Sequence, residues 1–426
     1  MEISSNPIAP LPPSSGFRVI LIFDMNSFFA SVELRDYLRE HKVDLRGKPV
    51  IVGKLRRRKV VSTATPEARA FGVKKGMPTL DAQELCEKHR PDTVWLPVRT
   101  LVYEAESDEI LKVVIDELAK MAFNPVIGTV GLDEAYVDLT PYCQGADAVA
   151  SLDNARPIAE KLKARILKER GLHCKIGIAS NMMMAKIATD QNAPLGINII
   201  YDKDWNTVLP PLDVSEIPHV GDATEEKLKS RIPPFNTIAD IRNTPPGFDF
   251  LPFVGKQKFL APILHDLAFG NDERVVKADG PPQSFSRIET FEYDTKDMKV
   301  IAGEIGYFGS DLQARLNKFK KLAGTVKVYY VHAANYEDRK KRSVQKKLDV
   351  PTDNCGVIMG KAMDLVAEHN LLKTELYSLG VAVDKLVDVG TPLPPPKPMK
   401  VLPPTKPKQS KKSRIEEQTV PLFKVT

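Results

Sequence analysis

Two apolar segments far apart in the sequence carry acidic residues. Asp24 closes the run Val19–Phe23, and Asp133 and Glu134 lie in the apolar-flanked segment Val126–Thr140. If both segments are strands of one sheet, the three carboxylates meet at one point. Clustered carboxylates repel one another unless a cation holds them, and oxygen ligands in this number suit Mg²⁺. Carboxylates around a pair of Mg²⁺ ions are typical of phosphoryl and nucleotidyl transfer.

The Asp-Glu dipeptide alone is uninformative, because it also begins at residues 108, 116 and 272. The copies at 108 and 116 fall in a stretch with helical spacing of apolar residues, so they are predicted to form a solvated face. At 133 the flanks are apolar and mostly aliphatic. A strand there carries its carboxylates against a core, which favours a functional role.

Length and composition indicate a multidomain globular protein. The chain has 426 residues, of which 42% are hydrophobic and 27% charged, so two to four domains are expected. A net charge of +6 permits nucleic-acid binding without demonstrating it. The four cysteines share no close spacing, so neither a zinc site nor a disulfide framework is expected. With no signal peptide or membrane helix in the pattern, we expect a cytosolic or nuclear protein.

Strands and helices alternate in the first half of the chain, which predicts an α/β domain. The expected elements are strand Phe17–Phe23 and helix Ser27–Glu40, followed by two short apolar runs at Pro49–Val52 and Val60–Val61, and then helix 100–121, strands within 126–139, helix 155–170, strand Lys175–Ala179 and helix 181–190, with a break at Asn192–Gly196.

From about 205 to 272 the pattern predicts short helices broken by Pro and Gly. Ile217–Leu228 and Leu251–Phe259 each contain Pro-x-Val-Gly, which we expect to be followed by a helix. This is the form of a helix-hairpin-helix, whose turn amides face a DNA phosphate. Ordinary helix caps are the alternative, and His219 replaces the usual first glycine of the first copy.

The last third of the chain predicts a linker and then a βαββαβ domain. The linker is Val275–Gln283, and the elements are strand 284–292, helix 297–320, strands 324–331 and 342–349, helix 355–369 and strand 374–386. Basic residues cluster on this domain, either as a solvated face or as a surface that follows a DNA backbone. The Pro- and Lys-rich stretch after Thr391 cannot bury a core, so disorder is expected.

These residues resemble the Y-family (translesion) DNA polymerases of the DinB and kappa type. The resemblance covers about residues 17 to 390 and rests on four blocks in the family's order: Phe23–Glu33, Ser62–Pro78, Leu132–Thr140 and Gly177–Asp190. It implies an α/β multidomain fold, a right-hand polymerase with palm, small fingers, helix-hairpin-helix thumb and βαββαβ little finger. The corresponding divisions are leader 1–16, palm 17–27 and 99–193, fingers 28–98, thumb 194–272, linker 273–283, little finger 284–390 and disordered basic tail 391–426.

The resemblance implies a DNA-directed DNA polymerase that adds dNMPs to a primer 3′-hydroxyl during translesion synthesis in DNA repair, without proofreading. Asp24 and Asp133 would bridge two Mg²⁺ ions, with Mn²⁺ as a possible substitute. Glu134 would bind the ion that activates the primer 3′-hydroxyl, and the backbone carbonyl of Met25 would complete the nucleotide-side ion.

The resemblance also implies roles for other residues. Arg69 and Lys186 would hold the triphosphate, and Phe29 would be the steric gate under the sugar. Without the resemblance these would be surface cations and a core aromatic. The remaining expected site residues are Phe28 (also assigned to the core) and Thr63 at the nucleotide, Ser62 and Gly76 over the nascent pair, and Gly221, Gly255 and Arg287 at the DNA.

Two positions depart from the family pattern. The family's Asp-x-Asp is Asp24-Met25-Asn26 here, which removes one charge at a position that is not a direct ligand. Pro66 replaces a tyrosine whose hydroxyl reaches the triphosphate. We expect these departures to affect nucleotide affinity or selectivity and to leave the chemistry in place.

Two other functions compete with polymerisation. A nucleotide cyclase also places carboxylates on such a sheet, and an inactive DNA-binding scaffold would keep the fold. The expected partners are primer–template DNA and dNTP, with no membrane, and a monomer is expected. Gln418, Leu422 and Phe423 resemble a bacterial clamp-binding peptide, and an incidental apolar patch near the end of the sequence is the alternative.

Overall fold

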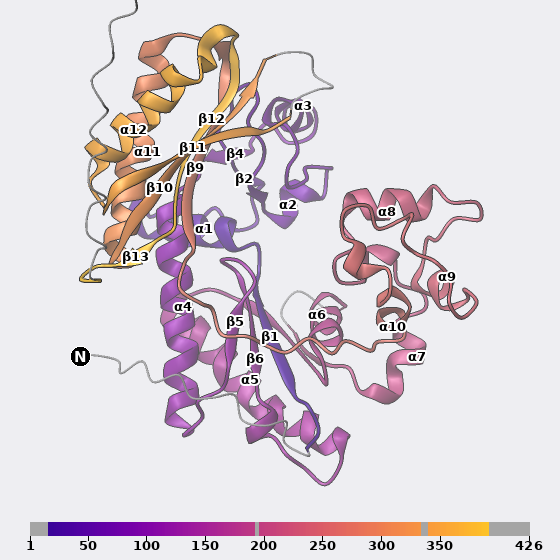
Figure 1. Cartoon of the computed structure of the whole chain (residues 1–426). Coiled ribbons are helices and arrows are strands. Elements are labelled where there is room, and N and C mark those ends of the chain that lie inside the picture. Colours follow the sequence, from indigo (N-terminus) through magenta and orange to yellow (C-terminus); the bar gives the residue numbers. More distant parts are fainter. Residues whose placement is uncertain (1–15, 192–195, 334–339, 392–426) are drawn as a thin grey trace, which may run out of the picture. The chain divides into compact units, whose positions relative to one another are not determined.

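The computed structural model describes residues 16–191, 196–333 and 340–391. They form two compact units. The first contains the described residues up to Pro281 together with Thr290–Thr295, and the second contains Pro282–Glu289 and the described residues from Lys296 on. Figure 1 shows the elements of both units. Residues 1–15 of the predicted leader, most of the predicted break (192–195) and the predicted tail after residue 391 lie outside the described residues.

A five-stranded sheet, the central sheet, organises the first unit, with strand order β5-β6-β1-β7-β8. Strand β1 pairs antiparallel with both β6 and β7. Both faces of β1 are buried, because its side chains alternate between two cores: Leu21 and Phe23 pack under α4 and α5, whereas Ile20 and Ile22 pack under α6. The bounds are β1 Ile20–Met25, β5 Ile127–Thr129, β6 Glu134–Asp138, β7 Cys174–Ala179, β8 Ile197–Ile199, α4 Thr100–Lys120, α5 Ala148–Arg170 and α6 Met182–Asp190.

Helix α6 lies very close to β7 because Gly177 has no side chain. A Cβ atom at Gly177 would lie 2.1 Å from the carbonyl oxygen of Ala185 and 2.7 Å from Oγ1 of Thr189. This glycine therefore sets the distance between α6 and the sheet.

A smaller three-stranded sheet, order β3-β2-β4, follows helix α1 in the same unit. Its core contains Ile51, Val61, Ala64, Ala68 and Ala82. The bounds are α1 Phe28–His41, β2 Val50–Val52, β3 Thr63–Ala64, α2 Pro66–Arg69, α3 Thr79–His89 and β4 Val94–Leu96.

Short helices make up residues 202–268, as the Pro and Gly pattern predicts. They are α7 Trp205–Val208, α8 Asp222–Lys229, α9 Ile238–Arg242 and α10 Leu264–Ala268, with 3₁₀ turns η2 Asp202–Asp204, η3 Val214–Glu216 and η4 Lys258–Leu260. Elsewhere η1 Thr140–Tyr142 and η6 Leu371–Lys373 are 3₁₀ turns.

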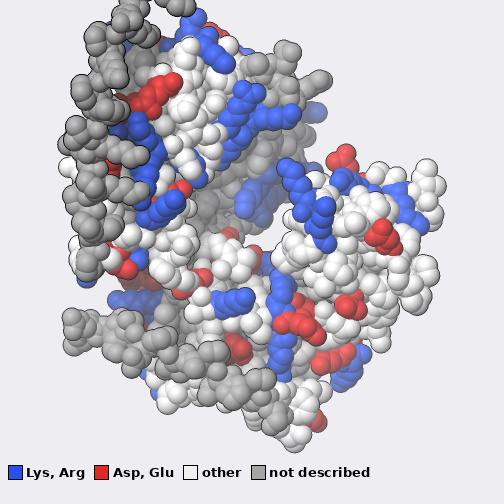
Figure 2. All heavy atoms as spheres, viewed as in Figure 1, with Lys and Arg blue, Asp and Glu red and all other residues white. Residues whose placement is uncertain are grey.

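The second unit has the predicted βαββαβ order. Its four-stranded sheet has strand order β11-β10-β12-β9, and α11 and α12 cover one face of it (Figure 1). Figure 2 shows Lys and Arg side chains grouped on the visible surface of this unit. The bounds are β9 Ser284–Thr295 (whose last residues belong to the first unit), α11 Met298–Lys318, β10 Lys321–His332, β11 Arg342–Thr352, α12 Cys355–Glu368, β12 Leu376–Asp384 and β13 Val387–Asp388.

Of the two short apolar runs, Pro49–Val52 contains β2, whereas Val61 bonds the turn residues Gly76 and Met77. Two expected helices differ from the structure. Helix α5 begins at Ala148, seven residues before the predicted start at 155, because the Asp147 carboxylate accepts the amide of Ala150 at 2.8 Å and caps it.

The second difference concerns the second hairpin segment. No α-helix directly follows Gly255; the chain first makes the 3₁₀ turn Lys258–Leu260, and α10 begins only at Leu264. Pro262 has no amide hydrogen to give the Lys258 carbonyl, so an α-helix cannot propagate there. The first segment does lead into α8, and His219 adopts the positive φ (70°) that the usual glycine would take. Among the described residues, no helix is both long and apolar enough to cross a bilayer.

Candidate active site

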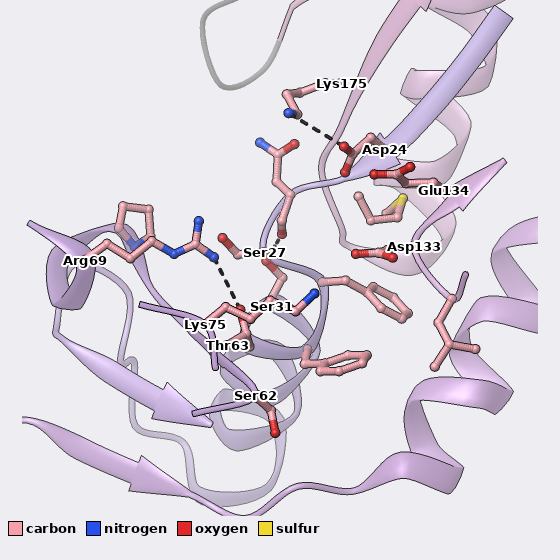
Figure 3. A pocket seen from close by; sticks show the side chains of 16 residues that line it. Asp24, Ser27, Ser31, Ser62, Thr63, Arg69, Lys75, Asp133, Glu134 and Lys175 are labelled. Carbon is pink, nitrogen blue, oxygen red and sulfur yellow. Dashed lines mark hydrogen bonds and ion pairs between the residues drawn. The ribbon is translucent and has the colours of Figure 1, made fainter. Parts of the chain in front are cut away.

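The three predicted carboxylates come together at one end of the β1–β6 pair. Asp24 lies directly opposite Glu134 in the strand register, and the amide of Met25 donates to the carbonyl of Asp133 at 2.9 Å. Together they line a cavity of about 620 Å³. Figure 3 shows the three side chains on one side of this cavity and Arg69 on the other.

A lysine from α6 holds two of these carboxylates. The ammonium of Lys186 lies 3.0 Å from Oδ2 of Asp24 and 2.6 Å from Oε1 of Glu134, and Asp190 Oδ2 is 3.5 Å away. Burial lowers the pKa of Lys186, but the ion pairs with Glu134 and Asp24 outweigh it, so the net pKa is raised and the ammonium stays charged. Lys175 lies 3.8 Å from Asp24 and also lines the cavity.

The surroundings of Asp133 and Glu134 disfavour the ionised form of both carboxylates. Burial and the nearby charge of Asp24 raise the pKa of Asp133. Burial also raises the pKa of Glu134, although Lys186 works in the opposite direction. Carboxylates whose ionised form is disfavoured in this way gain from a bound cation.

The donor set fits a hard divalent cation, but not in its present arrangement. In residues 16–191, 196–333 and 340–391 no group of three His, Cys, Asp or Glu side chains is spaced to hold a metal ion directly. The ammonium of Lys186 stands between Asp24 and Glu134 as a positive charge. These carboxylates therefore already hold one cation, and a metal ion bound by both must displace it.

The opposite side of the cavity carries a cationic and hydroxylic surface. Arg69, in α2, donates to Oγ1 of Thr63 at 3.3 Å, and both line the cavity together with Ser62 and Pro66. The amide of Gly76 donates to the carbonyl of Val61, directly before Ser62, at 2.9 Å. Gly76 has φ +82° and open space where a Cβ would be. Ser62, Thr63, Arg69 and Gly76 are thus brought together.

The two adjacent phenylalanines of α1 differ. Phe28 is 3% exposed and belongs to the core, yet its side also lines the cavity. Phe29 lines the cavity and stacks on Tyr103 of α4, with ring centroids 4.3 Å apart and an interplanar angle of 12°. The ring of Phe29, the expected steric gate, is therefore supported by the buried ring of Tyr103.

The predicted DNA-contact residues lie outside this cavity. Gly221 is the N-cap of α8, and Gly255, with φ +58°, lies beside α8: a Cβ there would be 3.2 Å from Lys227 Nζ. Arg287, in the second unit, lies over the ring of Tyr307 at 5.7 Å. Gln418, Leu422 and Phe423 lie outside the described residues.

Sequence reasoning missed several residues of this site. Lys75 and Lys175 line the cavity, and Tyr103 supports Phe29. Lys75 precedes the Gly76 turn, which is a usable signal for a residue at a loop tip. Tyr103 had no such signal, because an aromatic at helical spacing reads as core.

The chain is similar to known proteins in both sequence and structure. The impB/mucB/samB family matches residues 23–190, and the C-terminal domain of the same family matches residues 282–392. DNA polymerase IV of Dehalococcoides mccartyi is 31% identical over 350 residues, which is 82% of this chain and 82% of the relative. DNA polymerase IV of Methanoculleus marisnigri is 33% identical over 323 residues, 74% of this chain and 82% of that protein.

Solved structures agree with these relatives. A Y-family DNA polymerase chimera of Dbh and Dpo4 superposes with a TM-score of 0.68 at 25% identity, covering 87% of this chain and 99% of that one. An insertion ternary complex of Dbh DNA polymerase gives a TM-score of 0.59 at 25% identity, with the same coverage.

Proposed function

The chain belongs to the impB/mucB/samB family, the Y-family of DNA polymerases, and we propose that Asp24, Asp133 and Glu134 form its catalytic centre. It is a DNA-directed DNA polymerase of the translesion class and depends on divalent metal ions. The observation that carries the assignment is the pairing of Asp24 with Glu134 across β1 and β6, around a positive charge.

The proposed ions are two Mg²⁺. Asp24 and Asp133 would bind both, with Glu134 toward the primer and the Met25 carbonyl toward the nucleotide. When bound, such ions stabilise the entering and leaving oxygens of an in-line displacement. The primer 3′-hydroxyl would give its proton to a water molecule and its oxygen would bond to the α-phosphorus, while the bond from that phosphorus to the bridging oxygen breaks and pyrophosphate leaves.

The triphosphate lies between two cationic sources in this proposal. Arg69 presents a guanidinium fork beside the Thr63 hydroxyl, and Lys186 would turn from the carboxylates to the triphosphate. A fork and a point charge together neutralise several oxygens. Pro66 lines the same cavity but has no hydroxyl group. On this side of the cavity the triphosphate would therefore be bound by Arg69 and Thr63.

Phe29 would exclude a ribose 2′-hydroxyl, because its ring lines the cavity and the stacked ring of Tyr103 prevents it from moving away from the sugar. Ser62 and Gly76 would cover the nascent base pair with little bulk, which leaves room for damaged bases.

We further propose the division into palm (17–27, 99–193), fingers (28–98), thumb (194–272) and little finger (284–390). Primer–template DNA would contact the turns at Gly221 and Gly255, and Arg287 with the basic residues of the second unit. We expect a monomer acting in the bacterial nucleoid or, in a eukaryote, the nucleus, with Gln418–Phe423 docking on a sliding clamp.

Primer extension with dNTPs and Mg²⁺, on an undamaged and on a lesion-bearing template, tests this function. Template-directed extension on both supports it. Formation of cyclic nucleotides, or DNA binding without extension, would support the cyclase or the inactive scaffold instead.

A further inference from the structure

Two helices of the first unit face each other with matched stripes of residues. Each stripe has the i, i+4, i+7 spacing that places side chains on one helix face. The stripe on α1 is Phe29, Glu33 and Asp36, and the stripe on or just before α4 is Arg99, Tyr103 and Glu106.

The first contact between the stripes is the stack of Phe29 on Tyr103. Tyr103 is completely buried, and its hydroxyl donates to Oε1 of Glu33 at 2.7 Å. Burial, and then the hydrogen bond to Glu33, raise the pKa of Tyr103, so the hydroxyl remains a donor. The Tyr103 ring is therefore held on its face by Phe29 and at its tip by Glu33.

Glu33 is itself fixed from behind. Nε of Arg99 donates to the same Oε1 at 2.7 Å, and another nitrogen of Arg99 donates to Oδ2 of Asp36 at 3.0 Å. Glu33 and Asp36 are only 4% and 3% exposed. Arg35 continues the network, bonding Asp36 at 3.0 Å and Glu106 at 2.8 Å.

Packing alone does not explain charged groups here. Apolar side chains of similar volume usually stabilise a core as well as a buried ion pair does, or better. What a charged, directional pair adds is a fixed orientation for the group it bonds. In this network the only ring bonded to Glu33 is the one that supports Phe29.

We propose that Glu33, held by Arg99, is a positioning residue for sugar selection, which acts through Tyr103 to fix the height of the Phe29 ring. The proposal rests on the proposed function of Phe29 as the gate. A gate that distinguishes one hydroxyl must resist displacement by less than an ångström, which requires a supporting ring that neither tilts nor slides.

Two substitutions test the support without removing the gate. Tyr103→Phe keeps the stacked ring and removes only the hydroxyl group that donates a hydrogen bond to Glu33. Glu33→Gln keeps the volume and weakens the bonds to Tyr103 and Arg99. Glu106→Gln is the matched control, since it removes another buried carboxylate of the network that bonds neither ring. Phe29→Ala defines the range of the assay.

The measurement is kcat/KM for a dNTP and its matching rNTP in single-nucleotide primer extension, together with the melting temperature. We expect Tyr103→Phe and Glu33→Gln to lower the dNTP/rNTP ratio about three- to tenfold, the factor from one net hydrogen bond. The change should appear as faster rNTP addition, with dNTP addition within about twofold of the wild type. Glu106→Gln should leave the ratio unchanged.

The outcomes separate the two proposals. If Phe29→Ala leaves the ratio unchanged, the gate itself is wrongly assigned. If Phe29→Ala lowers the ratio but neither Tyr103→Phe nor Glu33→Gln does, the gate stands and the role of Glu33 is overturned. A lower melting temperature with an unchanged ratio also overturns it, and Tyr103→Phe decides if Glu33→Gln does not fold.

Discussion

The ammonium of Lys186 lies 2.6 Å from Oε1 of Glu134, closer than to any other carboxylate with which it pairs. Asp24, on the neighbouring strand, is 3.0 Å from the same nitrogen. One side chain of α6 therefore neutralises the two carboxylates to which we assign metal binding. Metal ions and Lys186 should compete for them.

Replacing Lys186 with Met should raise the affinity of the free protein for Mn²⁺. The substitution removes the two charge-assisted hydrogen bonds, to Asp24 and Glu134, that metal binding must break, so we expect a gain of about tenfold or more. Electron paramagnetic resonance of free Mn²⁺, without DNA or nucleotide, measures it. Lys168→Met on α5 is the charge-matched control, and an unchanged or lower affinity of Lys186→Met would contradict the competition.

Gly177→Ala should destabilise the first unit, because a Cβ would lie 2.1 Å from the carbonyl oxygen of Ala185. Overpacking of this kind costs about 1–3 kcal/mol or more, since α6 must move away from β7. Gly360→Ala, in α12 with open space around the added Cβ, should instead stabilise by about 0.5–1 kcal/mol. Urea unfolding of both variants checks this; equal effects would mean that α6 adapts freely.

The buried carboxylate of Glu106 should make stability acid-sensitive. Burial alone would raise its pKa, but bonds from Arg170 and Arg35 prevail and lower it to about 2. A carboxyl group whose pKa is lower in the folded protein stabilises the fold at pH values above its unfolded pKa, which is near 4.5 for Glu106. This stabilisation disappears as the pH falls toward 2.

Glu106→Gln should therefore destabilise the protein by about 3 kcal/mol at pH 7. The difference from the wild type should shrink as pH falls below about 4.5. Urea unfolding at pH 7 and at pH 3.5 measures it, and a difference that does not depend on pH would refute the ionic origin.

DNA binding should depend on exposed lysines of the second unit. Lys341 lies directly before β11 and Lys347 within it, and both are exposed. Replacing both with Ala should reduce the slope of log affinity against log salt by roughly 1 for each phosphate that is no longer neutralised. Anisotropy titrations at several salt concentrations measure it. Lys120→Ala on α4 is the control, and an unchanged slope in the double variant would place the DNA elsewhere.

Much of the fold could be predicted from periodicity. The apolar runs around Asp24 and Asp133 identified two strands, and the βαββαβ order of the last third is confirmed. The start of α5 was predicted seven residues too late, because the cap at Asp147 decides it. Periodicity cannot detect such contacts because they depend on single side chains.

The site was predicted only in part. The sequence could suggest that Asp24 and Glu134 lie on strands of one sheet, but not that these strands are neighbours. It also could not place the Lys186 ammonium between them, because that contact spans 162 residues. Likewise, the sequence around Glu33 alone indicates an acidic residue on the solvent-exposed face of an amphipathic helix. Only the packing of α1 on α4 reveals that it is buried against Arg99 and Tyr103.

The most direct test of the catalytic centre compares nucleotide addition with DNA binding in Asp24→Asn and Glu134→Gln. Single-turnover primer extension with Mg²⁺ gives the first quantity, and anisotropy with the same primer–template gives the second. Losing about 4 kcal/mol of charge stabilisation should slow addition roughly 10³-fold. DNA affinity should stay within about threefold, because the proposed DNA contacts lie elsewhere. Extension at the wild-type rate by either variant would contradict the assignment.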